Sequence, residues 1–357
     1  MKREFFAVCL WTGLASAVVA QDRASAAPAQ AERVRALAPL SVRGVNYYPR
    51  ETSWGGMWTK TPDPVWRADM ALAASLNINS VRTFISLSPA LEAAGLLHPD
   101  GTPTAAYLAR LNVFLNAAWQ NGIRAILCFD VDPKTVEGAR GLARCLRGVG
   151  AVVGAHRDDG RVLMWDLMNE PDDDAKWTEA TREYLRASLA LVRELDTNHV
   201  TTVGLTWRID RLGQVGLPDV IQYHEYSPKG QLFAQGAARV SQSIANQRRG
   251  GGSRPVLIGE FGMSTARDSR HAAARWSAPM GAAPGTEAEQ AAVYELVLSA
   301  AAKERVEGVA AWCLHDYPIG NPNEACFGLV RADGTLKPAA LTLKTWYGKW
   351  ASPSRAE

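Results

Sequence analysis

The chain lacks the sequence signals of several large enzyme classes. Its five cysteines in 357 residues include no Cys-x-x-Cys pair and no Cys/His spacing typical of zinc, so no metal site is predicted. Neither a Gly-x-Ser-x-Gly nor a His-Glu-x-x-His motif occurs, which argues against an elbow-mounted serine nucleophile and against a zinc protease. The glycines around Gly148 lack the spacing of a dinucleotide-binding loop and follow no predicted strand, so no cofactor is expected.

The charge balance excludes another broad class. The formal net charge is only +3, and no basic cluster with interleaved aromatic residues occurs, so nucleic acid is not an expected partner. By contrast, twelve tryptophans are many for this length. About half of them are expected in the core, and the rest suit a surface on which the flat apolar face of a sugar ring can stack.

The only apolar run near membrane length is at the N-terminus, where it resembles a secretory signal. Lys2 and Arg3 precede an apolar stretch from Phe5 to Ala20 that ends in small residues. We predict a signal peptide over residues 1–20 and a disordered linker over 21–39. The mature protein is therefore expected to be secreted or periplasmic, with no membrane anchor after cleavage, and to be a monomer.

Four cysteines remain after Cys9 leaves with the signal. An even number in an exported chain permits disulfides, and the local pairings would be Cys313–Cys326 and Cys128–Cys145. The sequence does not decide between paired and free thiols.

Eight short apolar or β-branched runs alternate with helical patterns between residues 40 and 352. Such alternation is typical of βα units and a parallel sheet, and it predicts one α/β domain, a single (β/α)₈ TIM barrel. The alternative is an open doubly wound sheet, which strict alternation of eight strands fits less well. The predicted strands are 42–47, 78–85, 123–129, 162–168, 200–205, 220–226, 256–259 and 308–314. The predicted helices are 64–76, 102–120, 135–146, 178–195, 231–247, 287–304 and 338–350, with only a short fifth helix.

Two glutamates end predicted strands in the same way, Glu170 after the fourth and Glu260 after the seventh. In a closed barrel the carboxyl ends of the strands meet at one mouth, where catalytic residues lie. Glu170 shares strand parity with Met164 and Met168, and Glu260 shares it with Val256 and Ile258. If these apolar residues fill the barrel, both carboxylates face the mouth, as a glycosidic cleavage site requires.

Five more residues are predicted at the same mouth, each with a chemical use. Arg82 can keep a neighbouring carboxylate ionised, and Asn169 can donate to a sugar hydroxyl. Tyr226 can orient Glu260, His224 can tune the acid or touch substrate, and Trp312 can stack under the reacting ring. Any one of these residues could be explained by a salt bridge or by core packing. Packing explains poorly why all of them lie at strand ends.

These motifs resemble glycoside hydrolase family 5, the cellulase and mannanase family of clan A, from about Leu40 to Trp350. The resemblance rests on the Asn-Glu-Pro of WDLMNEP, the glutamate of LIGEFG, the His-x-Tyr of YHEY, Arg82 in NSVRTF and Trp312 in AAWCLHD. It implies retention of anomeric configuration, with Glu170 as acid/base, Glu260 as nucleophile, and Tyr226 and Arg82 beside the nucleophile. The implied substrate is a β-linked glucan or mannan, as polysaccharide or oligosaccharide.

The third strand departs from the family pattern. Members often carry a histidine at its mouth, whereas this chain has Asp130 in the segment Cys-Phe-Asp-Val-Asp. Either Asp130 substitutes in sugar binding or that corner is built differently. Further sugar platforms are predicted at Trp54, Trp58, Trp207 and Tyr317, although the first two could instead pack the first loop.

Two other functions would fit a barrel with this mouth. A transglycosylase would use the same site with a sugar acceptor, and a catalytically silent carbohydrate-binding barrel would be expected to lack a glutamate or Arg82. Asp172, Asp173 and Asp174 are interpreted as a charge cluster at the start of the helix near Thr178, where negative charge is favourable.

Overall fold

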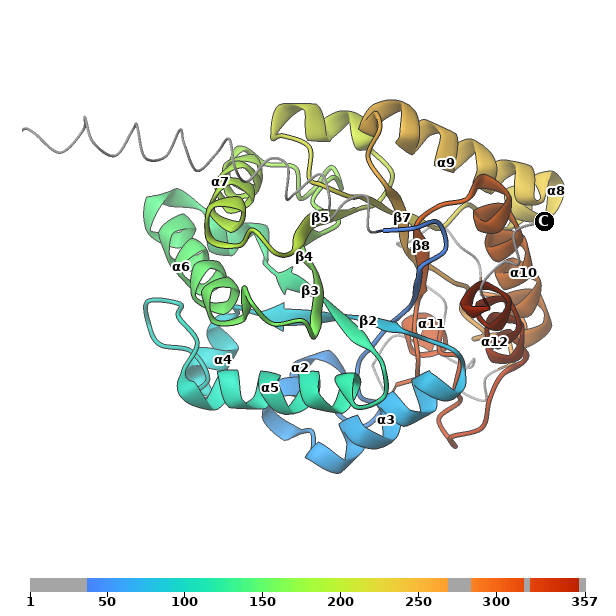
Figure 1. The fold of residues 1–357 in the computed structure, drawn as a ribbon, viewed down its shortest axis with the longest axis horizontal. Helices are drawn as coiled ribbons and strands as arrows, with labels where there is room; N and C mark the ends of the chain where they lie inside the picture. Colours follow the sequence, from blue (N-terminus) through green and yellow to red (C-terminus); the bar gives the residue numbers. More distant parts are fainter. Residues whose placement is uncertain (1–36, 269–283, 318–321, 353–357) are drawn as a thin grey trace, which may run out of the picture.

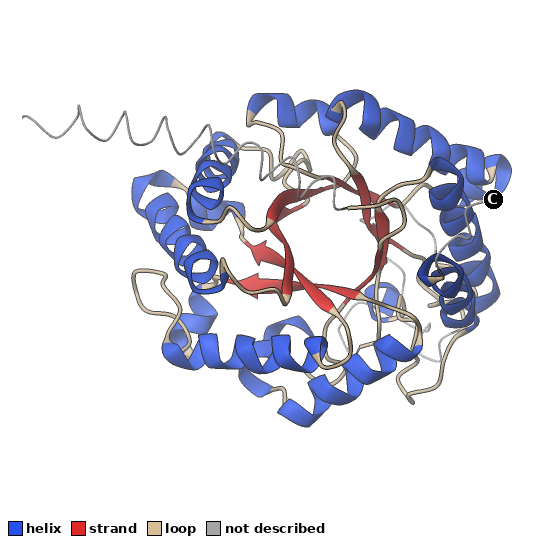
Figure 2. Cartoon of the chain, in the orientation of Figure 1, coloured by secondary structure: helices blue, strands red, loops and turns tan. Residues whose placement is uncertain are grey.

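A computed structural model describes residues 37–268, 284–317 and 322–352. Eight parallel strands close into a barrel in chain order, β1 next to β2 and so on until β8 pairs with β1. Figures 1 and 2 show this ring of strands with helices packed around it. The predicted single (β/α)₈ barrel is confirmed. The strands are β1 Val42–Asn46, β2 Ser80–Ser86, β3 Arg124–Asp130, β4 Val162–Asn169, β5 Val200–Leu205, β6 Ile221–Glu225, β7 Val256–Phe261 and β8 Gly308–Ala311. The predicted signal peptide lies outside the described residues, as does most of the linker.

Most of the outer ring follows the predicted helices, but two of them differ in extent, and the short helices Ser53–Lys60, Pro89–Ala93 and Pro322–Ala325 were not predicted. The predicted helix over 135–146 is wrong in extent, because a short 3₁₀ turn precedes a helix that runs ten residues further. The predicted helix over 231–247 is two helices, divided where Gly236 adopts a φ of 57°. The helices are α2 Ser53–Lys60, α3 Asp63–Ser75, α4 Pro89–Ala93, α5 Ala105–Trp119, α6 Gly138–His156, α7 Glu179–Leu195, α8 Lys229–Gln235, α9 Ala237–Gly251, α10 Glu287–Glu304, α11 Pro322–Ala325 and α12 Pro338–Ala351, with 3₁₀ turns η1 Pro133–Val136 and η2 Ile209–Gln214.

Side-chain caps explain where several helices begin. Thr178 accepts a hydrogen bond from the backbone N–H of Thr181 at the start of α7. Thr286 and Glu289 form a capping box at the start of α10. The short η2 turn between β5 and β6 is the predicted short fifth helix. Among the described helices, none is both long enough and apolar enough to span a membrane.

Apolar side chains form two separate clusters, a large one mainly outside the barrel and a small one inside it. The larger joins the outward faces of the strands to the helices and continues to cleft residues such as Phe84 and Trp312. The smaller consists of strand residues and one residue just before β6, so we assign it to the barrel interior: Val42, Ile126, Met164, Val200, Val220 and Leu257. The small inner cluster fills only the end of the barrel remote from the mouth.

The predicted strand parity is only partly right. Met164 lies in the inner cluster as expected, but Met168, Val256 and Ile258 pack in the outer one. Glu260 nevertheless reaches the mouth, because the β6–β7 register shifts by one residue between the pairs Tyr223–Ile258 and His224–Glu260. A similar shift occurs in β4 before Asn169. Such bulges re-aim side chains next to active sites.

Candidate active site

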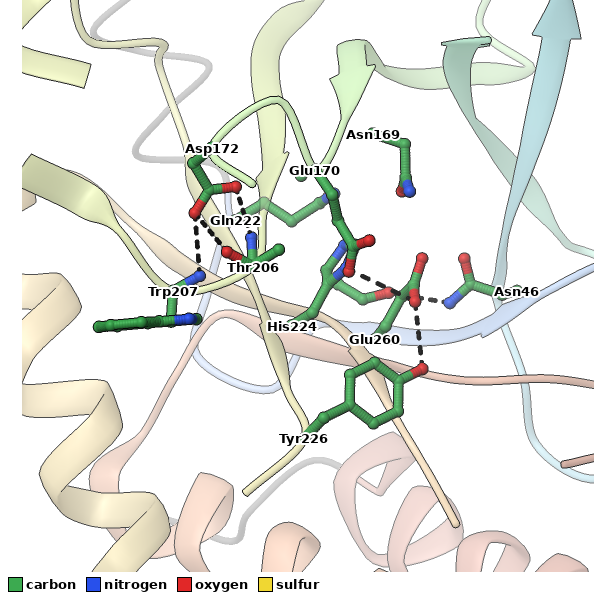
Figure 3. Close-up of polar contacts among 12 residues, drawn as sticks. Asn46, Asn169, Glu170, Asp172, Thr206, Trp207, Gln222, His224, Tyr226 and Glu260 are labelled. Carbon is green, nitrogen blue, oxygen red and sulfur yellow. Dashed lines mark hydrogen bonds and ion pairs between the residues drawn. The ribbon is translucent and has the colours of Figure 1, made fainter. Parts of the chain in front are cut away.

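A cleft of about 1200 Å³ opens at the carboxyl ends of the strands. It is lined by eight of the nine predicted site residues: Asp130, Asn169, Glu170, Trp207, His224, Tyr226, Glu260 and Trp312. The ninth, Arg82, lies fully buried and hydrogen-bonds to Asn169 and Glu260 of this lining. The barrel therefore brings all nine residues together, as Figure 3 shows for several of them.

Arg82 is the central hydrogen-bond donor among the buried polar residues beneath the cleft, and we call it the hub. Its guanidinium donates to Glu260 Oε1 at 2.7 Å, to Asn169 Oδ1 at 2.7 Å and to Asp166 Oδ2 at 2.8 Å. It also donates to Asn46 Oδ1 at 2.9 Å, across the register pair that joins β1 to β2. A planar fork of five donors suits such multiple recognition, and its charge favours ionised carboxylates around it.

The two predicted catalytic carboxylates face each other across His224. One oxygen of Glu170, one oxygen of Glu260 and a ring nitrogen of His224 all lie within 4.8 Å of one another. His224 Nδ1 is 2.8 Å from Glu170 Oε1 and 3.5 Å from Glu260 Oε2. Groups at these distances could also ligate a cation, but hydrogen bonds within the protein already account for the cluster.

Glu170 adopts an unusual backbone conformation. Its φ is 48°, in the left-handed region that residues with a side chain seldom occupy. Its N–H donates to the carbonyl of Gly204 on β5 at 2.7 Å, which holds the turn in place. Such outliers cluster at functional sites, where the surrounding structure compels them.

The environments of the two glutamates move their pKa values in opposite directions. Burial acts most strongly on both carboxyl groups and favours protonation. For Glu170 the hydrogen bond and charge of His224 outweigh burial, so its pKa is lowered. For Glu260 burial prevails over the charges of His224 and Arg82, and its pKa is raised.

The remaining predicted residues border the glutamates. Tyr226 donates its phenolic hydrogen to Glu260 Oε2 at 3.1 Å, from the β6 end as predicted. Trp312 lines the cleft just after β8 and meets Tyr48 edge-on. At the third strand, Asp130 lines the cleft while Cys128 lies inside the barrel, with its sulfur 3.4 Å from Arg82 Nη2. That corner thus presents a carboxylate to the cleft.

Sequence reasoning missed three buried residues that hold the hub. Asp166 accepts from Arg82, from the N–H of Gly204 at 3.0 Å and from Gln222 Nε2 at 2.8 Å. Asn46 donates to the carbonyl of Gly259 at 2.8 Å, beside Glu260. An acidic residue in the middle of the apolar run VLMWDLM was the available signal, because a buried charge needs a partner.

The interpretation of Asp172 as part of a helix-start charge cluster is wrong. Asp172 is buried, and its carboxylate accepts from the backbone N–H groups of Thr206, Trp207 and Arg208 at 2.7 to 3.1 Å. It therefore ties the loop after β4, which carries Glu170, to the loop after β5, which carries Trp207 (Figure 3). The helix begins only at Glu179.

The predicted sugar platforms divide into exposed and buried aromatics. Trp207 and Trp54 are 68% and 46% exposed and both line the cleft. Trp58 and Tyr317 are buried, and the Trp58 indole donates to the carbonyl of Phe84, so neither presents a free face. For Trp58 the alternative prediction, that it packs the first loop, is therefore correct.

All four cysteines of the described residues are buried, and none of them forms a disulfide. Neither local pairing left open by the sequence is formed. Cys128 faces the barrel interior near Arg82, whereas Cys145 lies on α6 with its sulfur 3.7 Å from Thr135 Oγ1.

Solved structures with the same fold are numerous but distant in sequence. An exo-beta-1,4-mannosidase from Opitutaceae bacterium strain TAV5 has a TM-score of 0.67 and 21% identity, covering 89% of this chain and 61% of its own. This chain thus spans about three fifths of that mannosidase. A GH5_18 protein from Streptomyces cattleya, in complex with Manb1-4GlcNAc, has a TM-score of 0.69 and 17% identity, with coverages of 88% and 81%. A GH5_18 protein from Bifidobacterium longum subsp. infantis has a TM-score of 0.67 and 18% identity, with coverages of 86% and 78%.

At these identities the structural likeness establishes the barrel alone, and comparison with curated proteins found none that matches. The family comes from a different finding. The model of the cellulase family, glycosyl hydrolase family 5, matches residues 40–316, which include all eight strands and end before α12. Since that match covers well over half of the sequence, the chain belongs to glycosyl hydrolase family 5.

Proposed function

We propose that this protein is a retaining β-glycosidase that works by double displacement, with Glu170 as acid/base and Glu260 as nucleophile. The observation that carries the proposal is the spacing of the two carboxylates, with one oxygen of each within 4.8 Å. Retaining enzymes hold the two groups about 5–5.5 Å apart, whereas inverting enzymes leave about 6.5–9.5 Å for a water molecule. An oxygen–oxygen distance of at most 4.8 Å supports the retaining arrangement.

The neighbours of Glu260 suit a nucleophile. Arg82 and Tyr226 each engage one of its two oxygens, so the carboxylate is fixed in orientation before the sugar arrives. Attack by Glu260 on the anomeric carbon forms a glycosyl ester while Glu170 protonates the departing oxygen. Glu170 then deprotonates the incoming water, which releases the sugar with its original configuration.

Asn169 and Trp312 are proposed to hold the reacting sugar. Asn169 Oδ1 already accepts from Arg82, so its amide nitrogen is oriented to donate to a hydroxyl beside the anomeric carbon. Trp312 offers an aromatic wall on which the apolar face of the ring can stack. We assign Asp130 and Trp207, which line the cleft, to sugar binding further along it.

The two pKa shifts run in the opposite directions to those that the proposed roles need. With its lowered pKa Glu170 is ionised first, and the raised pKa of Glu260 favours a proton there. The proposed reaction needs the proton on Glu170. His224 contacts both carboxylates and provides a short route for moving one proton between them. Once Glu260 is esterified its charge is gone, which favours the ionised Glu170 that water activation requires.

We propose a β-mannoside as the leading substrate class and a β-glucan as the alternative. The names of similar structures, an exo-beta-1,4-mannosidase and a protein solved with Manb1-4GlcNAc, support the mannoside, whereas the cellulase family name supports the glucan. We also propose export from the cytoplasm, on the basis of the signal-like N-terminus. Hydrolysis of mannan, glucan, xylan and their oligomers, with product lengths, tests the substrate and separates endo from exo action. The same product analysis detects transfer to a sugar acceptor.

Replacing Glu260 with alanine tests the catalytic roles. The Glu260→Ala variant is expected to lose essentially all turnover, since the covalent step is removed. Azide should then restore cleavage and give a glycosyl azide of inverted configuration, detectable by NMR. The exposed Glu51→Ala variant is the control and should keep normal activity. Near-normal turnover of Glu260→Ala without azide would refute the assignment.

A further inference from the structure

An ion pair that is largely buried holds the loop after β8. The side chains of Lys337 and Asp316 are 1% and 15% exposed, and Lys337 Nζ lies 2.7 Å from Asp316 Oδ1. The same ammonium donates to the carbonyl of Cys326 at 3.0 Å, and the same carboxylate oxygen accepts from the N–H of Gly328 at 2.8 Å. Burying two charges costs free energy unless they are paired and hydrogen-bonded, as both are here. The ion pair therefore fixes the backbone of residues 326–328.

Residues from two neighbouring elements fix the same segment. Gln290 of α10, which is fully buried, donates through Nε2 to the carbonyl of Phe327 at 3.0 Å. In the loop after β7, Thr265 donates through both its N–H and its hydroxyl to the carbonyl of Cys326, at 3.0 Å each. Of residues 326–328, only Phe327 lines the catalytic cleft. We use the name clamp for the four residues that hold this segment: Thr265, Gln290, Asp316 and Lys337.

Phe327 lies beside the tyrosine that hydrogen-bonds to Glu260. The two rings meet edge-on, with the centroids of Phe327 and Tyr226 6.2 Å apart and an interplanar angle of 88°. Tyr226 Oη donates to Glu260 Oε2 at 3.1 Å, as Figure 3 shows. Phe327 also packs against the backbone two residues after Glu260, because a Cβ atom built on Gly262 would lie 3.3 Å from Phe327 Cδ1. A displacement of Phe327 would thus release the tyrosine ring on one side.

We propose that Phe327 is a positioning residue, which the clamp fixes so that the Tyr226 hydroxyl stays on Glu260. The proposal rests on the assignment of Glu260 as nucleophile. A carboxylate attacks fastest when its orientation is set before the sugar binds, and Tyr226 sets it only while its own ring is held in place. No residue of the clamp lines the cleft, so the clamp influences the reaction through the segment that it holds.

A double-mutant cycle tests whether Phe327 acts through Tyr226. The substrate is the 4-nitrophenyl β-glycoside that the wild type cleaves, with the mannoside tried first. Phe327→Leu, which removes the edge-on contact, should lower kcat and kcat/KM equally, by about three- to tenfold, because the loss is confined to the transition state. Tyr226→Phe should lower both by more. In the Tyr226→Phe background, Phe327→Leu should have no further effect, since the hydroxyl that it positions is gone.

The matched control is Phe114→Leu in α5. Phe114 is fully buried and also meets aromatic rings edge-on, but it does not line the cleft. This control variant should have a lower melting temperature and an unchanged kcat. Two results would overturn the proposal: a Phe327→Leu variant with the kcat of the wild type, or losses of Phe327→Leu and Tyr226→Phe that multiply in the double variant.

Lys337→Met tests the clamp. Its kcat should fall as in Phe327→Leu, and the fall should vanish in the Tyr226→Phe background. Should Lys337→Met fail to fold with Asp316 left unpaired, the combination of Lys337→Met with Asp316→Asn, which removes both charges, takes its place. A folded clamp variant with the kcat of the wild type would also overturn the proposal. Turnover of the nitrophenyl glycoside by Glu260→Ala without azide would instead refute the nucleophile assignment on which the proposal rests.

Discussion

At the scale of single residues, the site depends on one buried cation. Arg82 lies between the carboxylates of Asp166 and Glu260, and its side chain and that of Asp166 have no exposed surface. Two charges that are buried beside a third group of opposite sign are stable only while that group remains. The predicted role of Arg82 as a neighbour of one carboxylate was therefore correct but incomplete, because it holds two of them.

Removal of Arg82 should destabilise the whole protein. The Arg82→Ala variant leaves Asp166 and Glu260 buried without their counterion, and we expect a loss of about 3–5 kcal/mol in the free energy of unfolding. Urea denaturation followed by circular dichroism measures it. The half-exposed Arg50, paired with the exposed Glu51, is the control, and Arg50→Ala should change stability by less than about 0.5 kcal/mol. Equal losses in the two variants would contradict the hub role.

His224 should set the pH range of activity. Its hydrogen bond and charge lower the pKa of Glu170, and its charge opposes the burial that raises the pKa of Glu260. In His224→Asn both glutamate pKa values should therefore rise. The acidic limb of kcat/KM follows the lower pKa of the pair and the alkaline limb follows the higher one, so both limbs should move to higher pH. The control is His98→Asn on an exposed loop, whose profile should match the wild type. A profile of His224→Asn that stays in place, whatever its height, would exclude this tuning.

At the scale of elements, the two shifts in strand register decide which way the glutamates point. Strict alternation along β7 would put Leu257 and Gly259 on the inner face and send Glu260 outward. The shift near Gly259 reverses this, and the space under Glu260 is taken by Gln222. A Cβ atom on Gly259 would lie 2.5 Å from the Gln222 side chain, so glycine is required by close approach.

Replacing Gly259 by alanine should displace Gln222, which hydrogen-bonds to Asp166 beneath the catalytic residues. The added methyl group would push Gln222 away from Asp166, with an expected loss of about 1–3 kcal/mol in stability and a lower kcat. Thermal denaturation and steady-state kinetics measure both effects. Gly154→Ala within α6 is the matched control, because a Cβ there meets nothing within 4 Å, and it should be neutral or stabilise the helix by up to about 1 kcal/mol. If the two variants have the same stability and kcat, the close contact at Gly259 does not contribute to either.

At the scale of the whole molecule, the fold is held by its packed layers and not by disulfides in its described part. The thiols of Cys128 and Cys313 are buried, and burial raises the pKa of each, which keeps them protonated and slow to react. Exported proteins often use disulfides. A protein of this size can bury enough apolar surface without them.

Thiol titration tests this state together with the predicted processing. The mature protein should react slowly with a thiol reagent when native and should reveal four thiols after unfolding, since Cys9 leaves with the signal. Reducing agent should leave the melting temperature unchanged. Intact mass of the protein recovered outside the cytoplasm should place its N-terminus near residue 21. Two thiols instead of four after unfolding would reveal a disulfide, and five would reveal an uncut chain.

The sequence alone was enough for the barrel and for the identity of the residues around its mouth. Eight apolar runs alternate with helical patterns, and hydrophobic periodicity is a local property that the chain displays directly. The same holds for residues at strand ends, such as Glu170 and Glu260, because the carboxyl ends of parallel strands meet wherever the sheet closes. Asp166 and Asn46 escaped notice because a buried polar residue is explained only by partners that are distant in the sequence.

Tertiary structure decided what depends on register and on distant pairing. Bulges placed Glu260 in the mouth against its local parity, and the Asp172 carboxylate turned from a presumed helix start into the link between two loops. The lack of a disulfide among the four described cysteines likewise follows from which side chains meet across the fold. The physical reason is common to all of them: secondary structure follows from neighbours along the chain, whereas the partner of a buried polar group is set only when the barrel closes.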